Sequence, residues 1–154
     1  MSKPDTADFN LTEFLPYQLS VASNALSNRI AQVYRREFGL KITEWRVMAM
    51  LGDAGALTQR ELTSRTLMDK VAVNRACKVL ETRGLARRRP NENDGRSHML
   101  ELTEEGWSMH GEIIPQARAI AAGLLDSLVR EQEENFRPML ARIRNHATQI
   151  GPEA

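Results

Sequence analysis

Apolar residues recur at helical spacing along most of this chain, and this pattern predicts a mainly α-helical protein. Stripes of this kind cover residues 15–38, 43–51, 70–82, 104–128 and 130–147. Residues 98–102 instead alternate, with His98, Leu100 and Leu102 expected on one inward face, as in a half-buried strand. The expected fold is therefore mainly α with a small β-hairpin in the middle of the chain.

The segment from Gln59 to Thr103 organises the chain. It contains two short helical patterns, a strand, a turn at residues 91–95 that is rich in Asn, Asp and Gly, and a return strand. Such a turn is typical of a hairpin tip. A helix-turn-helix followed by a hairpin is the winged helix-turn-helix arrangement, which we expect within residues 43–102.

Capping residues mark the ends of the predicted helices. Thr58 and Glu61 have the spacing of a capping box at the first helix of the pair. Asp69 is the expected N-cap of the second helix, and Gly84 lies where a glycine would end it. Thr43 is the expected N-cap of the helix that precedes the pair.

The second helix of the pair has two distinct faces. Its inner face is expected to be buried because apolar residues recur there at i, i+3, i+4 and i+7, namely Val73, Ala76, Cys77 and Leu80. Its outer face combines side-chain types that read base edges and phosphates, namely Val71, Asn74, Arg75 and Lys78. An ordinary amphipathic helix with a solvated face has the same pattern, so this face needs support from elsewhere.

The hairpin supplies that support. Arg87, Arg88 and Arg89 form a basic run on its first strand, and Arg96 lies near its tip. A basic tip suits the minor groove, where negative potential is concentrated. Residues 58–98 hold ten Lys or Arg against five Asp or Glu, whereas the rest of the chain holds eleven against fifteen. A basic segment on an otherwise acidic chain favours a polyanionic partner.

Three short sequence words extend this pattern in a fixed order. They are LETRGL at residues 80–85, DGRS at residues 94–97 and LTEEG at residues 102–106. Together they resemble the MarR family of bacterial transcriptional regulators, and the resemblance extends from about residue 15 to about residue 147. Two departures concern Leu67, which stands where the turn often has glycine, and Val71 with Ala72, which stand where Ser or Thr often begins the recognition helix.

The resemblance implies a homodimer that binds a pseudo-palindromic DNA operator. Its dimerisation helices would be residues 11–38 and 103–150, within a single domain of residues 1–154. The apolar stripes favour the same interpretation, because these helices have little else to bury against in so short a chain. Pro115 predicts a kink and Pro138 an interruption in the last two helices. The DNA contacts that we predict are Lys70, Val71, Asn74, Arg75, Lys78, Arg87, Arg88, Arg89, Asp94, Arg96 and Ser97.

The resemblance also implies a small-molecule effector, often an aromatic acid or a phenolic compound, where the dimer helices meet the winged part. Polar residues on the otherwise apolar first helix are candidates for this site, namely Asn24, Ser27 and Asn28. Arg46, beside Trp45, is placed to meet an anionic group. The competing interpretation is that Trp45 belongs to the core and that Arg46 is a surface residue.

The sequence contains no constellation for catalysis. Its three histidines are far apart, and no Cys or His lies at a metal-ligand spacing. We therefore expect neither an enzyme nor a cofactor. Cys77, on an apolar face, is expected to be a protonated and inert core residue. We expect a cytoplasmic protein with no membrane partner. The sequence has one cysteine, no apolar run of ~20 residues and no apolar stretch at its N-terminus.

Two functions from different classes compete. The first is a sequence-specific DNA-binding regulator, a repressor that a small aromatic or phenolic molecule releases from DNA. The second is a winged-helix module that binds other proteins. A protein-binding module has no need of Arg75, Lys78, Arg96 and the basic run at residues 87–89 together, so the first function is favoured.

Overall fold

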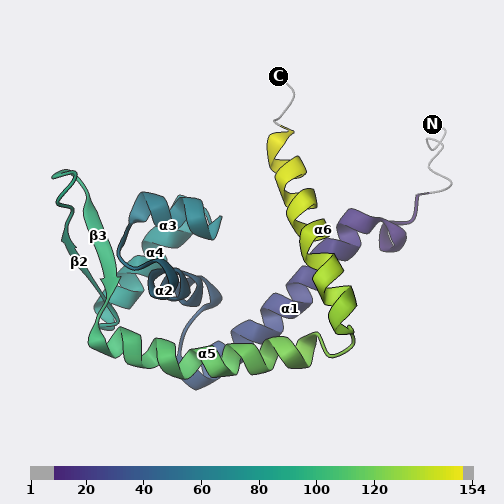
Figure 1. The fold of residues 1–154 in the computed structure, drawn as a ribbon, viewed down its shortest axis with the longest axis horizontal. Helices are drawn as coiled ribbons and strands as arrows, with labels where there is room; N and C mark the ends of the chain where they lie inside the picture. The colour runs from purple at the N-terminus through teal and green to yellow at the C-terminus, as the bar shows by residue number, and fades with distance from the viewer. Residues whose placement is uncertain (1–8, 151–154) are drawn as a thin grey trace, which may run out of the picture. The chain divides into compact units, whose positions relative to one another are not determined.

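The computed structural model describes residues 9–150, which form helices and a small sheet (Figure 1). The elements are the 3-10 helix η1 (Leu11–Glu13), α1 (Leu15–Phe38), α2 (Ile42–Ala54), β1 (Leu57–Thr58), α3 (Gln59–Thr66), α4 (Lys70–Thr82), β2 (Ala86–Pro90), β3 (His98–Leu102), α5 (Glu104–Leu124) and α6 (Arg130–Gln149). The chain divides into two compact units between Pro115 and Gln116, within α5.

Helices α3 and α4 form the predicted helix-turn-helix, and both begin at the predicted caps. The Thr58 hydroxyl accepts a hydrogen bond from the Glu61 amide at 3.2 Å, and the Glu61 carboxylate accepts one from the Thr58 amide at 2.8 Å. The Asp69 carboxylate accepts a hydrogen bond from the amide of Ala72 at 2.8 Å. These bonds satisfy amide groups that the first turn of a helix leaves without partners.

The turn between α3 and α4 depends on Leu67. This residue has φ 56° and ψ 27°, and within residues 9–150 it is the only residue other than glycine with a positive φ. The left-handed conformation explains why glycine is common at this place, since a Cβ atom is unfavourable there. The Leu67 side chain is also 68% exposed, so little burial offsets the strain.

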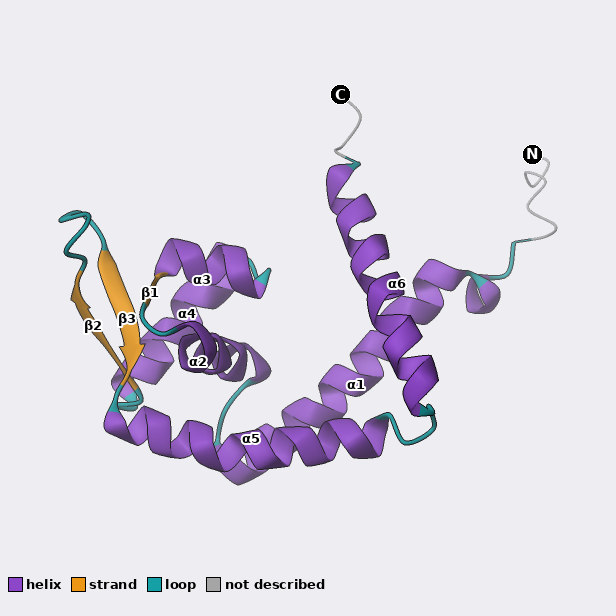
Figure 2. Cartoon of the chain, viewed as in Figure 1, coloured by secondary structure: helices purple, strands orange, loops and turns teal. Residues whose placement is uncertain are grey.

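The predicted hairpin is confirmed and belongs to a three-stranded sheet (Figure 2). Strands β2 and β3 pair antiparallel, with Ala86 opposite Leu102 and Pro90 opposite His98. Strand β1 pairs with the other edge of β3 and was not predicted, because two residues are too few to show periodicity. Leu100 and Leu102 are buried as predicted, but His98 is exposed because it lies next to the hairpin tip.

The core of the first unit lies among α2, α3, α4 and the sheet, which gather together in Figure 1. The predicted inner face of α4 is confirmed, since Val73, Ala76, Cys77 and Leu80 are at most 2% exposed. The start of α5 packs closely against the segment between α4 and β2. A Cβ atom at Gly106 would lie 2.0 Å from the carbonyl oxygen of Leu85, so this position requires glycine.

The predicted start of α2 and the predicted interruption of α6 were wrong. Helix α2 begins at Ile42 with Lys41 as its N-cap rather than Thr43, because the buried Glu44 carboxylate accepts a hydrogen bond from the Lys41 amide at 2.9 Å. Helix α6 continues through Pro138, whose ring removes one backbone bond while the flanking turns keep theirs. Helix α5 also contains Pro115, and α1 ends at Phe38 with Gly39 as its C-cap.

Candidate nucleic-acid interface

The outer face of α4 carries exposed cations on a rigid support. Burial of the opposite face fixes the helix, and Lys70, Arg75 and Lys78 project from its exposed side. Val71 is 57% exposed on the same helix, and Asn74 is half-buried. In the part of the chain that the structure describes, none of the three cations forms an ion pair. Their charges are therefore available to an external anion.

The basic run of β2 has a different arrangement from the one that its sequence indicates. Arg87 and Arg89 lie on one face of the strand, and their Nε atoms donate to the two carboxylate oxygens of Glu101 at 2.9 and 3.0 Å. Arg88 lies on the other face, and its Nε donates to Glu81 of α4 at 2.6 Å. Hydrogen bonds from Arg87 and Arg89 lower the pKa of Glu101, so this carboxylate stays charged. The run therefore offers less net positive charge than three arginines would suggest.

The wing tip is built by its own polar residues. The Asp94 carboxylate accepts a hydrogen bond from the Arg96 amide at 3.0 Å, and the Asn91 side chain donates to the Ser97 hydroxyl at 2.9 Å. These bonds give Asp94 and Ser97 a role in shaping the tip. The Arg96 side chain is exposed and, within residues 9–150, has no ion-pair partner. Arg96 is thus the cation that the tip presents to its surroundings.

A hollow beside α3, lined by polar and charged residues, adds residues that the sequence interpretation missed. It has a volume of about 570 Å³ and is lined by Gln59, Arg60, Thr63, Ser64 and Lys70. In helix-turn-helix proteins the first helix crosses the DNA backbone, and hydroxyl and cationic groups contact phosphates. The only signal for this hollow in the sequence was that Arg60 belongs to the basic segment. That the hydroxyl groups of Thr63 and Ser64 lie near Lys70 became visible only in the folded structure.

Arg46 lines a second hollow, of about 410 Å³, at the surface between α2 and α3. Its walls are Trp45, Arg46, Ala49, Met50, Asp53, Arg65 and Thr66. The hollow thus combines an aromatic ring with two guanidinium groups, and Arg65 was not predicted to belong to it. The lining residues do not include Asn24, Ser27 or Asn28 of α1, so the structure does not bring the predicted effector residues together in this hollow.

Aromatic side chains from α1 and α5 form a cluster with Trp45 of α2. Its ring centroid lies 5.3 Å from that of Tyr34 in α1 and 6.0 Å from that of His110 in α5, and His110 lies 5.6 Å from Trp107. Burial lowers the pKa of His110 and raises the pKa of Tyr34. Helical spacing links only Trp107 and His110, three residues apart on α5, so the cluster with Tyr34 and Trp45 was not predictable. The Trp45 ring therefore packs against Tyr34 and His110 and also lines the hollow that contains Arg46.

Cys77 lies in the core, as predicted. It is 1% exposed, and burial raises the pKa of its thiol to about 11. Among residues 9–150 the structure has no cluster of three or more His, Cys, Asp or Glu that would hold a metal ion. In the same range, no helix has the length and apolar character that crossing a bilayer requires.

A helix-turn-helix with unpaired cations on its second helix, beside a hairpin with an exposed arginine at its tip, defines a winged helix-turn-helix DNA-binding protein. Residues 38–97 match the sequence model of the MarR family. YwoH, an uncharacterized HTH-type transcriptional regulator of Bacillus subtilis, is 29% identical to this chain over 122 residues, which cover 79% of this chain and 88% of YwoH.

Solved structures have the same fold. A MarR family transcriptional regulator from Silicibacter pomeroyi has 26% identity and a TM-score of 0.78, covering 97% of this chain and 99% of its own. BpsR of Bordetella bronchiseptica is 20% identical to this chain, with a TM-score of 0.82, and the match covers 88% of this chain and 96% of the BpsR chain. The DNA binding of BpsR is regulated by 6-hydroxynicotinic acid. Over residues 38–97 the chain thus matches the MarR family, and the relatives that it resembles over most of its length are transcriptional regulators.

Proposed function

We propose that this regulator is a homodimeric repressor that binds a pseudo-palindromic operator and leaves it when a small aromatic anion binds. The observation that carries this proposal is the set of exposed cations on α4 and at the wing tip. Arg75, Lys78 and Arg96 have no ion-pair partner within residues 9–150 and flank one buried scaffold. Two copies of this set, related by a two-fold axis, match two half-sites about one helical turn apart.

Arg75 and Arg96 have separate roles in this proposal. Arg75, on the recognition helix, reads bases or phosphates in the major groove, and Arg96 enters the adjacent minor groove. Arg75→Ala should cost about 1–3 kcal/mol of binding and relax sequence preference at one position. Arg96→Ala should weaken binding and reduce preference for A·T-rich flanks.

Fluorescence-anisotropy titrations on the operator and on duplexes with single base changes measure both effects. Arg118→Ala, which removes an exposed cation of α5 outside the winged part, is the matched control. The proposed roles are wrong if both variants remain folded and bind every duplex as the parent does.

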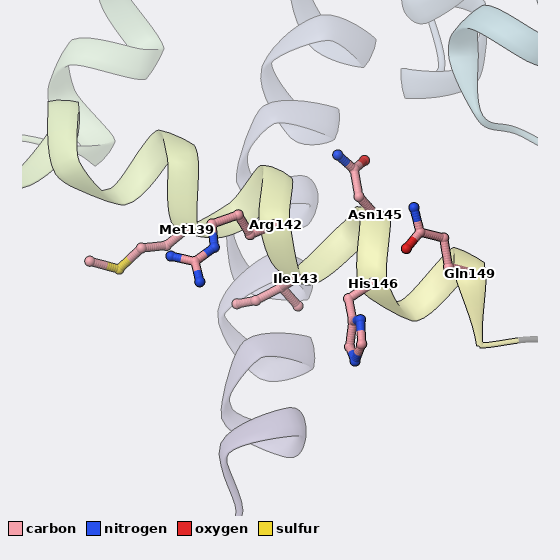
Figure 3. A pocket seen from close by; sticks show the side chains of 6 residues that line it. All are labelled: Met139, Arg142, Ile143, Asn145, His146 and Gln149. Atoms are coloured by element: carbon pink, nitrogen blue, oxygen red, sulfur yellow. The ribbon is translucent and has the colours of Figure 1, made fainter.

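The homodimer is supported by apolar side chains that the single chain leaves exposed. On α6 these are Phe136, Met139, Leu140 and Ile143. Figure 3 shows Met139 and Ile143 beside Arg142, Asn145, His146 and Gln149, all from this one helix, so the surface is open rather than an enclosed site. The N-terminal half of α1 exposes Leu15, Val21 and Leu26 in the same way. A second copy of the chain would cover such surfaces, as in other two-fold dimers.

The Arg46 hollow is the site that we propose for the effector. The Trp45 ring offers a flat apolar wall, and Arg46 and Arg65 offer charge to a carboxylate. Asp53 also lines the hollow and would disfavour a second negative group on the ligand. Helix α2 packs against α4, so a ligand that shifts α2 also shifts the recognition helix. A coupling of ~1–3 kcal/mol would weaken DNA binding about 5- to 150-fold.

A thermal-shift screen of aromatic carboxylates, followed by operator release, tests this site. Arg46→Ala should lower the affinity for the active compound roughly tenfold or more while operator binding without the compound is retained. Asn28→Ala, in the predicted α1 candidates, shows whether that helix also contributes. If the Arg46→Ala protein binds the compound and releases DNA as the parent does, the effector site lies elsewhere.

A further inference from the structure

Arg83 joins the ends of two helices that are far apart in the sequence. Its Nη2 donates to the carbonyl oxygen of Phe38 at 2.9 Å, and its Nη1 donates to that of Gly39 at 3.1 Å. Phe38 and Gly39 form the C-terminal end of α1, and Arg83 is the C-cap residue of α4. One guanidinium group therefore links the end of α1 to the recognition helix α4.

The end of α1 leaves these two carbonyls to Arg83. Gly39 adopts a left-handed conformation with φ 64°, and its amide donates to the carbonyl of Arg35 at 3.0 Å. The Leu40 amide donates to the carbonyl of Tyr34 at 3.2 Å. This cap satisfies two of the last carbonyls, while those of Phe38 and Gly39 accept the bonds from Arg83. A cation at this position also meets the negative end of the helix dipole.

The geometry separates Arg83 from the other cations of the basic segment. Two of its nitrogens are directed to backbone carbonyls of α1, whereas Arg75 and Lys78 have no such bonds among residues 9–150. The planar fork of arginine makes two bonds in fixed directions, which an ammonium group on a flexible stem does not. Arg83 is thus suited to fixing an angle between helices rather than to contacting a phosphate.

We propose that Arg83 is a positioning residue that sets the angle between α1 and α4, and through it the half-site spacing that the dimer accepts. This inference rests on the proposed dimer, in which α1 belongs to the shared surface. Helix α1 has 24 residues and is therefore about 36 Å long. A change of about 5° at its C-terminal end moves its far end by about 3 Å, close to the 3.4 Å rise of one base pair.

Operators that differ only in half-site spacing test this role. The parent is first measured on its selected operator and on versions with one base pair removed, one added and two added. Arg83→Gln shortens the side chain and removes the fork, so the preference for the best spacing should fall roughly fivefold or more. The dependence of affinity on salt should stay the same, because no phosphate contact is lost.

Two further variants make the result specific. Arg83→Lys keeps the charge without the fork and should give an intermediate loss of spacing preference. Arg36→Gln removes a charge from the last turn of α1, where Arg36 pairs with its exposed neighbour Glu37, and should leave the preference unchanged. Thermal melts show which variants fold, and Arg83→Lys decides the question if Arg83→Gln does not.

Two outcomes overturn the inference. One is an unchanged spacing preference in folded Arg83→Gln, or in Arg83→Lys where only that variant folds. The other is a uniform loss of affinity at every spacing, with a salt slope shallower by about 0.9, which would identify Arg83 as a phosphate contact. Failure of the parent to prefer any operator would instead contradict the proposed function.

Discussion

Glu101→Gln tests whether the wing arginines are restrained by their own protein. The parent carboxylate accepts hydrogen bonds from Arg87 and Arg89, so the three residues together carry a net charge of about +1. The glutamine variant carries about +2 at the same place, on a strand that the proposed complex places beside DNA. If the added charge engages one phosphate, the plot of log affinity against log salt steepens by about 0.9. A fourfold rise in salt would then cost the variant about 3.5 times more affinity than it costs the parent.

The assay is a set of anisotropy titrations at several salt concentrations, on the operator and on a scrambled duplex. Both duplexes should be bound more tightly by the variant at low salt, because phosphate contacts carry no sequence information. Glu112→Gln, which removes an exposed carboxylate from α5, is the matched control for net charge. Stability should change little, since exposed ion pairs contribute about 0–1 kcal/mol. Equal slopes for parent and variant, or an equal effect of Glu112→Gln, would refute the reasoning.

Two further predictions concern stability. Leu67→Gly should leave the free energy of unfolding, measured in urea titrations, unchanged or raise it by up to about 1 kcal/mol. Glycine removes the left-handed strain at this exposed residue but also adds conformational freedom to the unfolded chain. Leu67→Ala keeps the strain, so a larger loss of stability in Leu67→Gly than in Leu67→Ala would contradict this prediction. Burial lowers the pKa of His110 below its ordinary value of 6.5, because the buried imidazole is more stable when it is neutral. The stability that neutral His110 contributes is therefore fully present above about pH 6.5 and is lost as the pH falls through the lower pKa of the folded state. His110→Gln should flatten this part of the stability–pH profile, and the same flattening in the exposed His146→Gln would contradict the assignment.

Much of the fold was predictable because it depends on local signals. The caps at Thr58 and Asp69 and the buried face of α4 follow from residues at most four positions apart, and the structure confirms them. The start of α2 was placed two residues late because Lys41 acts through its backbone, which leaves no side-chain signal. Strand β1 was missed because it forms only through pairing with β3.

The candidate site was predictable only in part, since charge in a sequence does not show pairing. The sequence indicates that Arg87 and Arg89 are free cations, but the register of the sheet places Glu101 opposite Arg87, and both arginines donate hydrogen bonds to it. Arg65 joins Arg46 in one hollow because α2 and α3 pack together, and no spacing in the sequence indicates this. All of the DNA contacts predicted from the sequence stay predictions, as do Arg46 and the effector residues on α1.

Selection of bound fragments from a genomic library, with footprinting of the enriched duplexes, tests the central claim most directly. A dimer that presents two copies of α4 and the wing should enrich one pseudo-palindromic sequence, protected at two half-sites about 10 bp apart. Its affinity should fall steeply with salt while exceeding that for a scrambled duplex by roughly a thousandfold or more. Equal and weak binding to every fragment, with no repeated sequence among those recovered, would contradict the account.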